Sequence, residues 1–188
     1  MNKQTKIAGL LQRFGWTIVP VLTIWAVQVL NVLSFYSLNT WFGLVPRRVT
    51  GLDGIIFMPF LHTSFAHTIA NTGPLFVFSL LLALTARDKI LGLTVTIVVL
   101  GGSAVWIFGA PAIHVGASGL IFGYFGYLVS RGFVDRRPLT VLVSTGVAIA
   151  YGAMVLGVLP NQPGISWESH LFGALVGLGY AVRSSSRA

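Results

Sequence analysis

Six long apolar stretches run along the chain, separated by short segments that contain proline, glycine and charged residues. An α-helix needs about 20 predominantly apolar residues to cross the hydrocarbon core of a membrane. Most of the stretches reach or approach that length, so the pattern predicts an all-α, polytopic membrane protein built as a bundle of six transmembrane helices. We expect the spans at about 16–38, 57–84, 90–108, 118–130, 139–159 and 170–182.

The composition agrees with a membrane protein. Hydrophobic residues make up 55% of the 188 residues and charged residues only 9%, too few to cover the surface of a soluble domain. No polar linker interrupts the stretches, so we expect a single membrane domain over residues 1–188, with its core at about 57–182. The net charge of +8 is divided among short clusters, a pattern that encodes topology and does not favour nucleic-acid binding. The absence of cysteine excludes disulfides and thiolate metal sites.

The basic clusters predict the orientation of the helices. With the N-terminus inside, only Arg47 and Arg48 of the 12 Lys and Arg residues fall on the outer side. Cytoplasmic loops carry the excess of Lys and Arg in membrane proteins. We therefore expect residues 1–13 to be a cytoplasmic segment and both termini to be cytoplasmic, in a multi-pass protein of a bacterial-type plasma membrane.

The fourth and sixth spans are short. Arg131 follows Ser118 by 13 residues, and Arg183 follows His170 by the same distance. At about 1.5 Å per residue, such a segment covers about 20 Å of a hydrocarbon core that is about 30 Å thick. Both helices should therefore begin about 10 Å below the outer surface, at a water-filled pocket that is open to the outside.

Ser118 is the best candidate nucleophile. Gly116 and Gly119 leave its backbone uncrowded, so that a substrate carbonyl can approach closely. Its amide would lie at a helix N-terminus, where unpaired N–H groups favour a developing oxyanion. The alternative is a serine N-cap in a glycine-rich helix contact, and these residues alone do not decide between the two.

His170 is the best candidate general base, because burial keeps an imidazole neutral and able to take a proton from a serine. Gly173 and Gly177 follow it and allow a close approach of another helix. The fourth span offers a complementary thin face at Gly119, Gly123 and Gly126. The alternative is that His170 is a polar anchor between helices.

His67 and Asn71 are spaced i, i+4 and therefore share one face of the second span. Both side chains can donate hydrogen bonds to a negative oxygen, as an oxyanion hole requires. The alternative is a polar pair that binds neighbouring helices. We interpret His62 as structural although it could line the same cavity. We interpret His114, four residues before Ser118, as a loop histidine near the surface, with a place at the substrate entry as the alternative.

No carboxylate is placed to orient His170, since Glu168 lies two residues upstream, in the preceding loop. This favours a Ser-His dyad over a triad. His62 and His67 are five residues apart with no acidic residue between them, unlike the zinc-binding helix of metalloproteases. We therefore expect no metal site.

Three motifs together resemble the rhomboid family of intramembrane serine proteases. They are His62-x4-His67-x3-Asn71, Gly116-Ala117-Ser118-Gly119 and His170-x2-Gly173-x3-Gly177, in the second, fourth and sixth spans. Their order and spacing agree over about 57–182, most of the chain.

The resemblance implies a role for each motif residue. Ser118 would attack the peptide carbonyl to form an acyl-enzyme, with His170 as base and then acid. The Ser118 amide, His67 and Asn71 would hold the oxyanion, and Phe122 would stack on the catalytic imidazole. Substrates would be single-pass membrane proteins with a helix-destabilising sequence and a small residue near the cut, without a cofactor.

The first outer loop departs from the family pattern. Members often carry a Trp-Arg pair there, and the corresponding place reads Asp53-Gly54. Arg47 and Arg48 could serve part of that role. The fifth span is apolar and contains glycine, which makes it a candidate gate for substrate.

Two other functions compete with an endopeptidase. A catalytically inactive rhomboid-like protein that binds membrane clients would not need both the dyad and the oxyanion donors. A small transporter or channel would need polar groups along a continuous path, whereas the inner halves of the fourth and sixth spans are apolar. The sequence predicts no oligomeric state.

Overall fold

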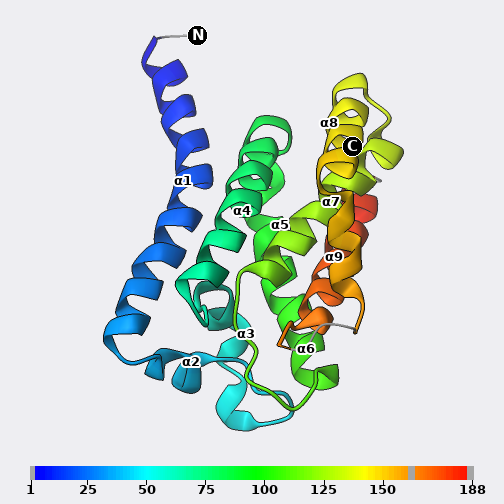
Figure 1. Cartoon of the computed structure of the whole chain (residues 1–188). Coiled ribbons are helices and arrows are strands. Elements are labelled where there is room, and N and C mark those ends of the chain that lie inside the picture. The colour runs from blue at the N-terminus through cyan, green and yellow to red at the C-terminus, as the bar shows by residue number, and fades with distance from the viewer. Residues whose placement is uncertain (1–2, 161–163, 186–188) are drawn as a thin grey trace.

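The computed structural model describes residues 3–160 and 164–185, and within them the chain is all-α. The only β-type contact in this part of the chain is an isolated antiparallel bridge between Leu44 and His114. Figure 1 shows long helices arranged side by side, with α1 at one edge and α7, α8 and α9 together on the opposite side. The predicted all-α bundle is confirmed.

The long segments correspond to the six predicted spans. They are α1 (Lys3–Leu33), α4 (Phe65–Thr85), the continuous run of α5 (Ile90–Thr96), η4 (Ile97–Gly101) and α6 (Gly102–Phe108), then α7 (Ser118–Asp135), α8 (Pro138–Tyr151) continued by η5 (Gly152–Val158), and α9 (Trp167–Ser185). Short elements form the connections: α2 (Ser37–Phe42), η1 (Val49–Gly51), α3 (Gly54–Phe57), η2 (Met58–Phe60) and η3 (Arg87–Lys89).

Four segments of the described chain are long and apolar enough to cross a membrane, namely Gly15–Leu33, Phe65–Thr85, Arg87–Phe108 and Pro138–Val158. The protein is therefore an integral, polytopic membrane protein. The other two predicted spans, α7 and α9, pack closely on each other, and α7 also contacts α4 and α8.

Several predicted boundaries are wrong: α7 ends at Asp135 and not near residue 130, and α9 spans Trp167–Ser185 and not 170–182. The first span ends at Leu33 and not near residue 38, because Phe35 and Tyr36 adopt positive φ angles of 54° and 62°, which no α-helix accommodates. The second begins at Phe65 and not near residue 57, because Ser64 caps it by accepting a hydrogen bond from the His67 N–H. The apolar residues before Ser64 belong to the short helices α3 and η2.

Glycines set the distance between α7 and α9. A Cβ on Gly173 would overlap the carbonyl oxygen of Gly119, and a Cβ on Gly177 would overlap that of Gly123. The two helices are therefore in backbone contact, which larger residues would prevent. This contact brings the N-terminal ends of α7 and α9 next to each other.

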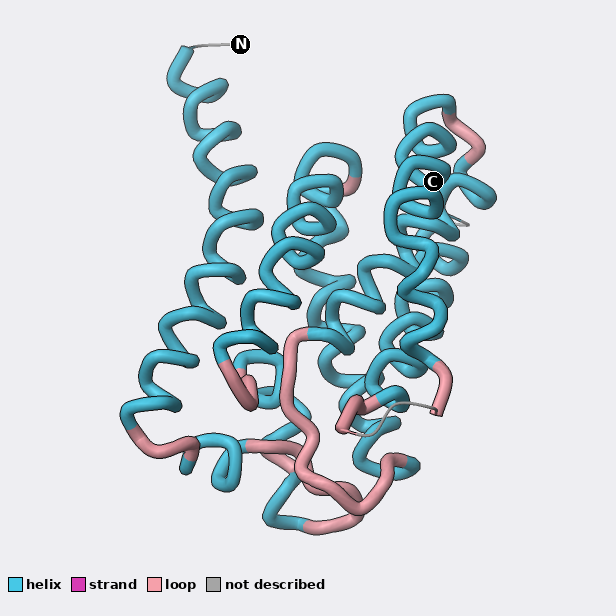
Figure 2. The backbone as a smooth tube through the Cα atoms, viewed as in Figure 1, coloured by secondary structure: helices cyan, strands magenta, loops and turns pink. Residues whose placement is uncertain are grey.

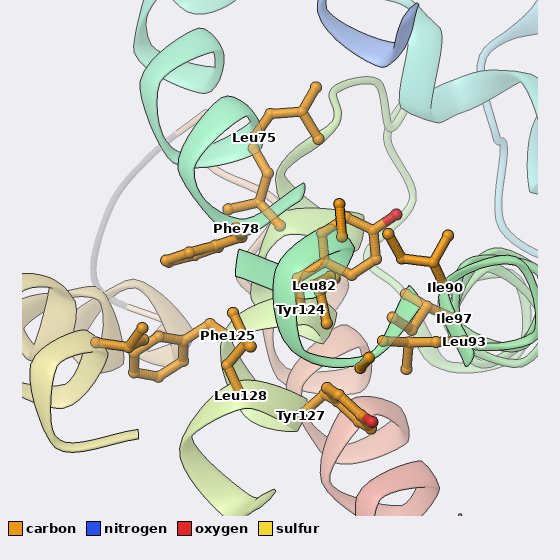
Figure 3. Close-up of a cluster of buried hydrophobic side chains, with 14 of the residues drawn as sticks. Leu75, Phe78, Leu82, Ile90, Leu93, Ile97, Tyr124, Phe125, Tyr127 and Leu128 are labelled. Carbon is orange, nitrogen blue, oxygen red and sulfur yellow. The ribbon is translucent and has the colours of Figure 1, made fainter. Parts of the chain in front are cut away.

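A hydrophobic cluster fills the interior of the bundle, on the C-terminal side of the first turn of α7. Figure 3 shows Leu75 and Phe78 of α4 facing Tyr124 and Phe125 of α7, with Ile97 of η4 beside them. All of these side chains are buried. The cluster separates the side of the α4–α5 and α7–α8 turns from the opposite end of the bundle, where Ser118 and His170 lie.

Candidate active site

The loop between α6 and α7 carries Ser118 into the middle of the bundle. In Figure 2 this loop, drawn in pink, runs back from the end of α6 before α7 begins. It is fixed to the connection between α1 and α4: the Leu44 and His114 backbones exchange two hydrogen bonds of 3.0 and 2.8 Å, and the Gly116 N–H donates to the Met58 carbonyl at 2.9 Å. These bonds determine where α7 starts.

Gly116 allows the turn into α7. Its φ of 127° is a conformation that residues with a side chain rarely adopt. The turn leaves Ser118 as the first residue of α7, and no acceptor in the described part of the chain takes its N–H. This N–H is therefore a hydrogen-bond donor at the positive end of a helix.

His170 lies in the first turns of α9 and is only 8% exposed. Its ring stacks on Phe122, one helical turn after Ser118, with the ring centroids 4.1 Å apart and an angle of 3° between the planes. Its Nδ1 is 2.8 Å from the carbonyl oxygen of Gly157 in η5. A side chain at residue 157 would contact both rings, since a Cβ there would be 2.9 Å from Phe122 Cζ and 3.3 Å from His170 Nδ1.

The bond to Gly157 defines the tautomer of His170. A carbonyl oxygen can only accept a hydrogen bond, so the Nδ1 of a neutral ring must carry the proton. The lone pair is then on Nε2. A neutral His170 can thus act as a base only through Nε2.

The first turns of α4 present His67 and Asn71. The Asn71 amide donates one hydrogen bond to the His67 carbonyl at 2.9 Å, which leaves its second N–H for another acceptor. The position of a hypothetical Cβ on Gly116 lies 2.9 Å from His67 Nε2 and 3.7 Å from Ser118 Oγ. The His67 ring and the Ser118 hydroxyl therefore face the same small space.

One cavity of about 640 Å³ is lined by all four predicted residues, Ser118, His170, His67 and Asn71. Phe122 also lines it, together with Tyr151 and Met154 of the α8–η5 segment and Ala70 and Pro74 of α4. In the described chain, no hydrogen bond joins Ser118 directly to His170. The chemistry that this cavity offers is a hydroxyl, two imidazoles, an amide and a helix N-terminal N–H around a common space.

His62 lies outside the cavity, whereas His114 lines it. His62 does not line the cavity; it is fully buried, and its ring packs edge-on against His67 with centroids 4.9 Å apart. Burial is the main cause that lowers the pKa of His62 to about 4, and the nearby His67 lowers it further. His114 is not near the surface: it is buried, lines the cavity and bonds Ser166 Oγ through Nδ1 at 2.6 Å.

The prediction that Glu168 lies in a loop is wrong: this residue is in the first turn of α9, and it is 4% exposed. Its carboxylate accepts a hydrogen bond from the Ala110 N–H at 2.9 Å. His114 also bonds the Ala110 carbonyl, at 2.9 Å. The loop that carries Ser118 is thus attached to the start of the helix that carries His170, a link that connects the two halves of the cavity.

The connection between α1 and α4 does not contain the tryptophan–arginine pair, and other contacts hold it. The Asp53 side chain caps α3 by accepting from the Gly54 N–H. Arg47 donates to the carbonyl oxygens of Ile107 and Gly109, at 3.1 and 2.8 Å. Arg47 therefore ties this connection to the end of α6.

Sequence reasoning missed several contacts that orient the residues of the cavity. The Gly157 carbonyl carries no signal in the sequence, because every residue has a carbonyl. His114 and Ser166 each lie four residues before a dyad candidate, a symmetry that could have pointed to their contact. Among the described residues, no three His, Asp or Glu side chains gather closely enough to hold a metal ion.

The fold and this cavity define an all-α membrane protein with a Ser- and His-lined cavity between its helices. Residues 46–187 match the Rhomboid domain. An uncharacterized protein of Mycobacterium bovis is 35% identical over 174 residues, which cover 87% of this chain and 72% of the relative. A Mycobacterium tuberculosis protein, also uncharacterized, matches to the same extent. An uncharacterized Mycobacterium leprae protein is 35% identical over 182 residues, 89% of this chain and 72% of its own.

The chain therefore belongs to the rhomboid family, which in general consists of intramembrane serine proteases.

Proposed function

We propose that the protein is an intramembrane serine endopeptidase that uses Ser118 and His170 as a catalytic dyad. The observation that carries the proposal is the single cavity that both side chains line together with His67 and Asn71. A serine hydroxyl is a weak nucleophile until a base removes its proton, and a neutral imidazole is such a base. The match to the Rhomboid domain supports the same activity.

His170 takes the proton in the first step. The bond of Nδ1 to the Gly157 carbonyl leaves the Nε2 lone pair as the proton acceptor. Ser118 Oγ attacks the peptide carbonyl as its proton moves to Nε2. The imidazolium then gives this proton to the leaving amine, and a water molecule, deprotonated by the same nitrogen, hydrolyses the acyl-enzyme.

Three donors converge on the oxyanion in this mechanism. The Ser118 N–H lies at the helix N-terminus, His67 Nε2 faces the same space as Ser118 Oγ, and Asn71 has a second N–H beyond its bond to His67. Donors fixed before the reaction stabilise the developing charge without reorganisation, and this is usually the largest single contribution to catalysis.

Membrane-embedded single-pass proteins are the proposed substrates. The cavity is walled on one side by Ala70 and Pro74 of α4 and on another by Tyr151 and Met154. The segment that carries Tyr151 and Met154, Pro138–Val158, is the least buried of the four apolar spans. We propose that a substrate segment reaches Ser118 between α4 and α8, by displacement of α8.

A cross-link between α4 and α8 tests this route. The Phe78 and Tyr151 rings are in edge-on contact, with centroids 4.8 Å apart. Because the chain has no cysteine, cysteines at these two positions would be its only thiols. A short bis-maleimide between them should abolish cleavage of a membrane substrate. Full cleavage after complete cross-linking would exclude the route.

The proposed activity is tested by reconstitution. The purified protein is placed in liposomes with a tagged single-span protein whose span contains a helix-destabilising Gly-Ala-Pro segment. Cleavage within the span by the unmodified protein, and none by the Ser118→Ala or His170→Ala variant, is the expected result. Equal cleavage by the Ser118→Ala variant would refute the proposal.

A further inference from the structure

The two nitrogens of the His67 ring face different partners. Nδ1 is 3.2 Å from the hydroxyl oxygen of Thr63, and this is the only hydrogen bond that the ring makes in the described chain. Nε2 lies toward Gly116 and Ser118, on the side where the oxyanion would form. The state of Nδ1 therefore determines what Nε2 can do there.

An oxyanion donor must carry a hydrogen on Nε2. A neutral imidazole has only one N–H, so Nδ1 must then hold a lone pair and accept a hydrogen bond. A threonine hydroxyl can donate that bond, whereas a carbonyl oxygen cannot. A threonine hydroxyl can also accept a hydrogen bond, so Thr63 is compatible with either tautomer of a neutral His67, whereas the Gly157 carbonyl admits only the Nδ1–H tautomer of His170. His67 carries its hydrogen on Nε2 when Thr63 is the donor of this bond.

No other described group competes for this role. The neighbouring His62 contacts the His67 ring edge-on, but no hydrogen bond joins the two rings within the described residues. Thr63 lines the cavity and lies directly before Ser64, which caps α4 by accepting from the His67 N–H. Adjacent residues thus hold the backbone and the ring of His67.

We propose that Thr63 is a positioning residue, whose hydroxyl donates to His67 Nδ1 and so keeps the hydrogen on Nε2, directed at the oxyanion. This inference rests on the proposed endopeptidase function. Thr63 does not contact the reacting atoms and acts through His67. No bond to substrate and no proton transfer is assigned to it.

Two substitutions separate the hydroxyl from the shape of the side chain. Thr63→Val keeps the volume and removes the donor, while Thr63→Ser keeps the donor. In the liposome cleavage assay, Thr63→Val should lower kcat about 10-fold with KM within about 2-fold of the unmodified value, because the lost interaction forms with the oxyanion of the transition state. Thr63→Ser should restore most of kcat. The matched control is Thr23→Val on α1, whose hydroxyl bonds only the Val19 carbonyl in the described chain.

The tautomer can be measured without any cleavage. In protein labelled with ¹⁵N-histidine, with the His67 signals assigned by comparison with His67→Ala, Nε2 should have the shift of a protonated nitrogen and Nδ1 that of an unprotonated one. Thr63→Val should shift both signals toward a mixture of tautomers. A protonated Nδ1 in neutral His67 of the unmodified protein would overturn the proposal, as would an unchanged kcat in Thr63→Val.

These measurements also separate the two proposals. If the unmodified protein cleaves no membrane substrate, the endopeptidase function fails, while the ¹⁵N shifts still decide whether Thr63 sets the tautomer of His67. If cleavage occurs and Thr63→Ser loses as much kcat as Thr63→Val, the function stands and the role of the Thr63 hydroxyl is refuted.

Discussion

The rings of Phe122 and His170 are nearly parallel, with an angle of 3° between their planes and a distance of 4.1 Å between their centroids. Phe122 belongs to the helix that begins with Ser118, and His170 belongs to the helix packed against it. The stacking therefore fixes the imidazole relative to the serine across the α7–α9 contact. Together with the bond from Nδ1 to Gly157, it defines the ring position on two sides.

Replacing Phe122 with alanine tests this relationship. We expect Phe122→Ala to lower kcat about 2-fold to 10-fold, since an aromatic pair contributes about 0.5–1.5 kcal/mol beyond its buried area. Phe133→Ala on the same helix is the matched control, because Phe133 is 74% exposed. Cleavage kinetics in liposomes give both values. Equal kcat in the two variants would remove the stacking from the mechanism.

The glycine contact between α7 and α9 predicts a loss of stability. In Gly173→Ala, the new methyl group would overlap the Gly119 carbonyl oxygen, so the helices must separate. We expect a decrease in the free energy of unfolding of about 1–3 kcal/mol, measured by denaturation in mixed micelles. Gly179→Ala, with open space at its Cβ, should not be destabilised. Equal stability of the two variants would contradict the close approach.

Asn71 is predicted to act on the transition state. Asn71→Ala should lower kcat about 10-fold to 1000-fold with little change in KM, because loss of one oxyanion donor costs about 1.4–4 kcal/mol in the transition state. Ile69→Ala, an exposed position on the same helix, is the control. Full turnover in Asn71→Ala would exclude Asn71 from the oxyanion site.

The buried His62 predicts a dependence of stability on pH. Its pKa in the folded protein, about 4, lies below the ordinary value of 6.5, so the unfolded chain binds the proton more tightly. The contribution of the neutral His62 ring to the free energy of unfolding is fully present above pH 6.5 and is lost as the pH falls from there toward about 4. We expect His62→Phe to lose less stability over this pH range than the unmodified protein. Parallel unfolding curves for both proteins at pH 7 and pH 5 decide this, and equal losses would contradict it.

The sequence was sufficient to predict the spans and the polar residues that face the cavity. It did not predict the groups that orient these polar side chains, such as the Gly157 carbonyl. Ser118, His170, His67 and Asn71 stand out because polar side chains are rare in apolar spans, and the cavity contains all four. Their partners come from distant segments: Gly157 bonds His170 through its backbone, and no side-chain pattern reports such a contact.

The boundary errors have a physical cause. Hydropathy alone does not distinguish a transmembrane helix from the short apolar helices α3 and η2 that precede α4. The cap at Ser64 was a local signal that would have placed the start of α4 correctly. The prediction that Glu168 lies in a loop follows from a predicted helix start at His170, whereas α9 begins at Trp167.

The most direct test of the dyad is covalent labelling of the serine. The detergent-solubilised protein is treated with a fluorophosphonate, and the modified peptide is identified by mass spectrometry. We expect one adduct on Ser118, absent in Ser118→Ala, strongly reduced in His170→Ala and unchanged in Ser130→Ala. Labelling that persists in Ser118→Ala, or an unmodified protein that does not react, would contradict a nucleophilic Ser118 activated by His170.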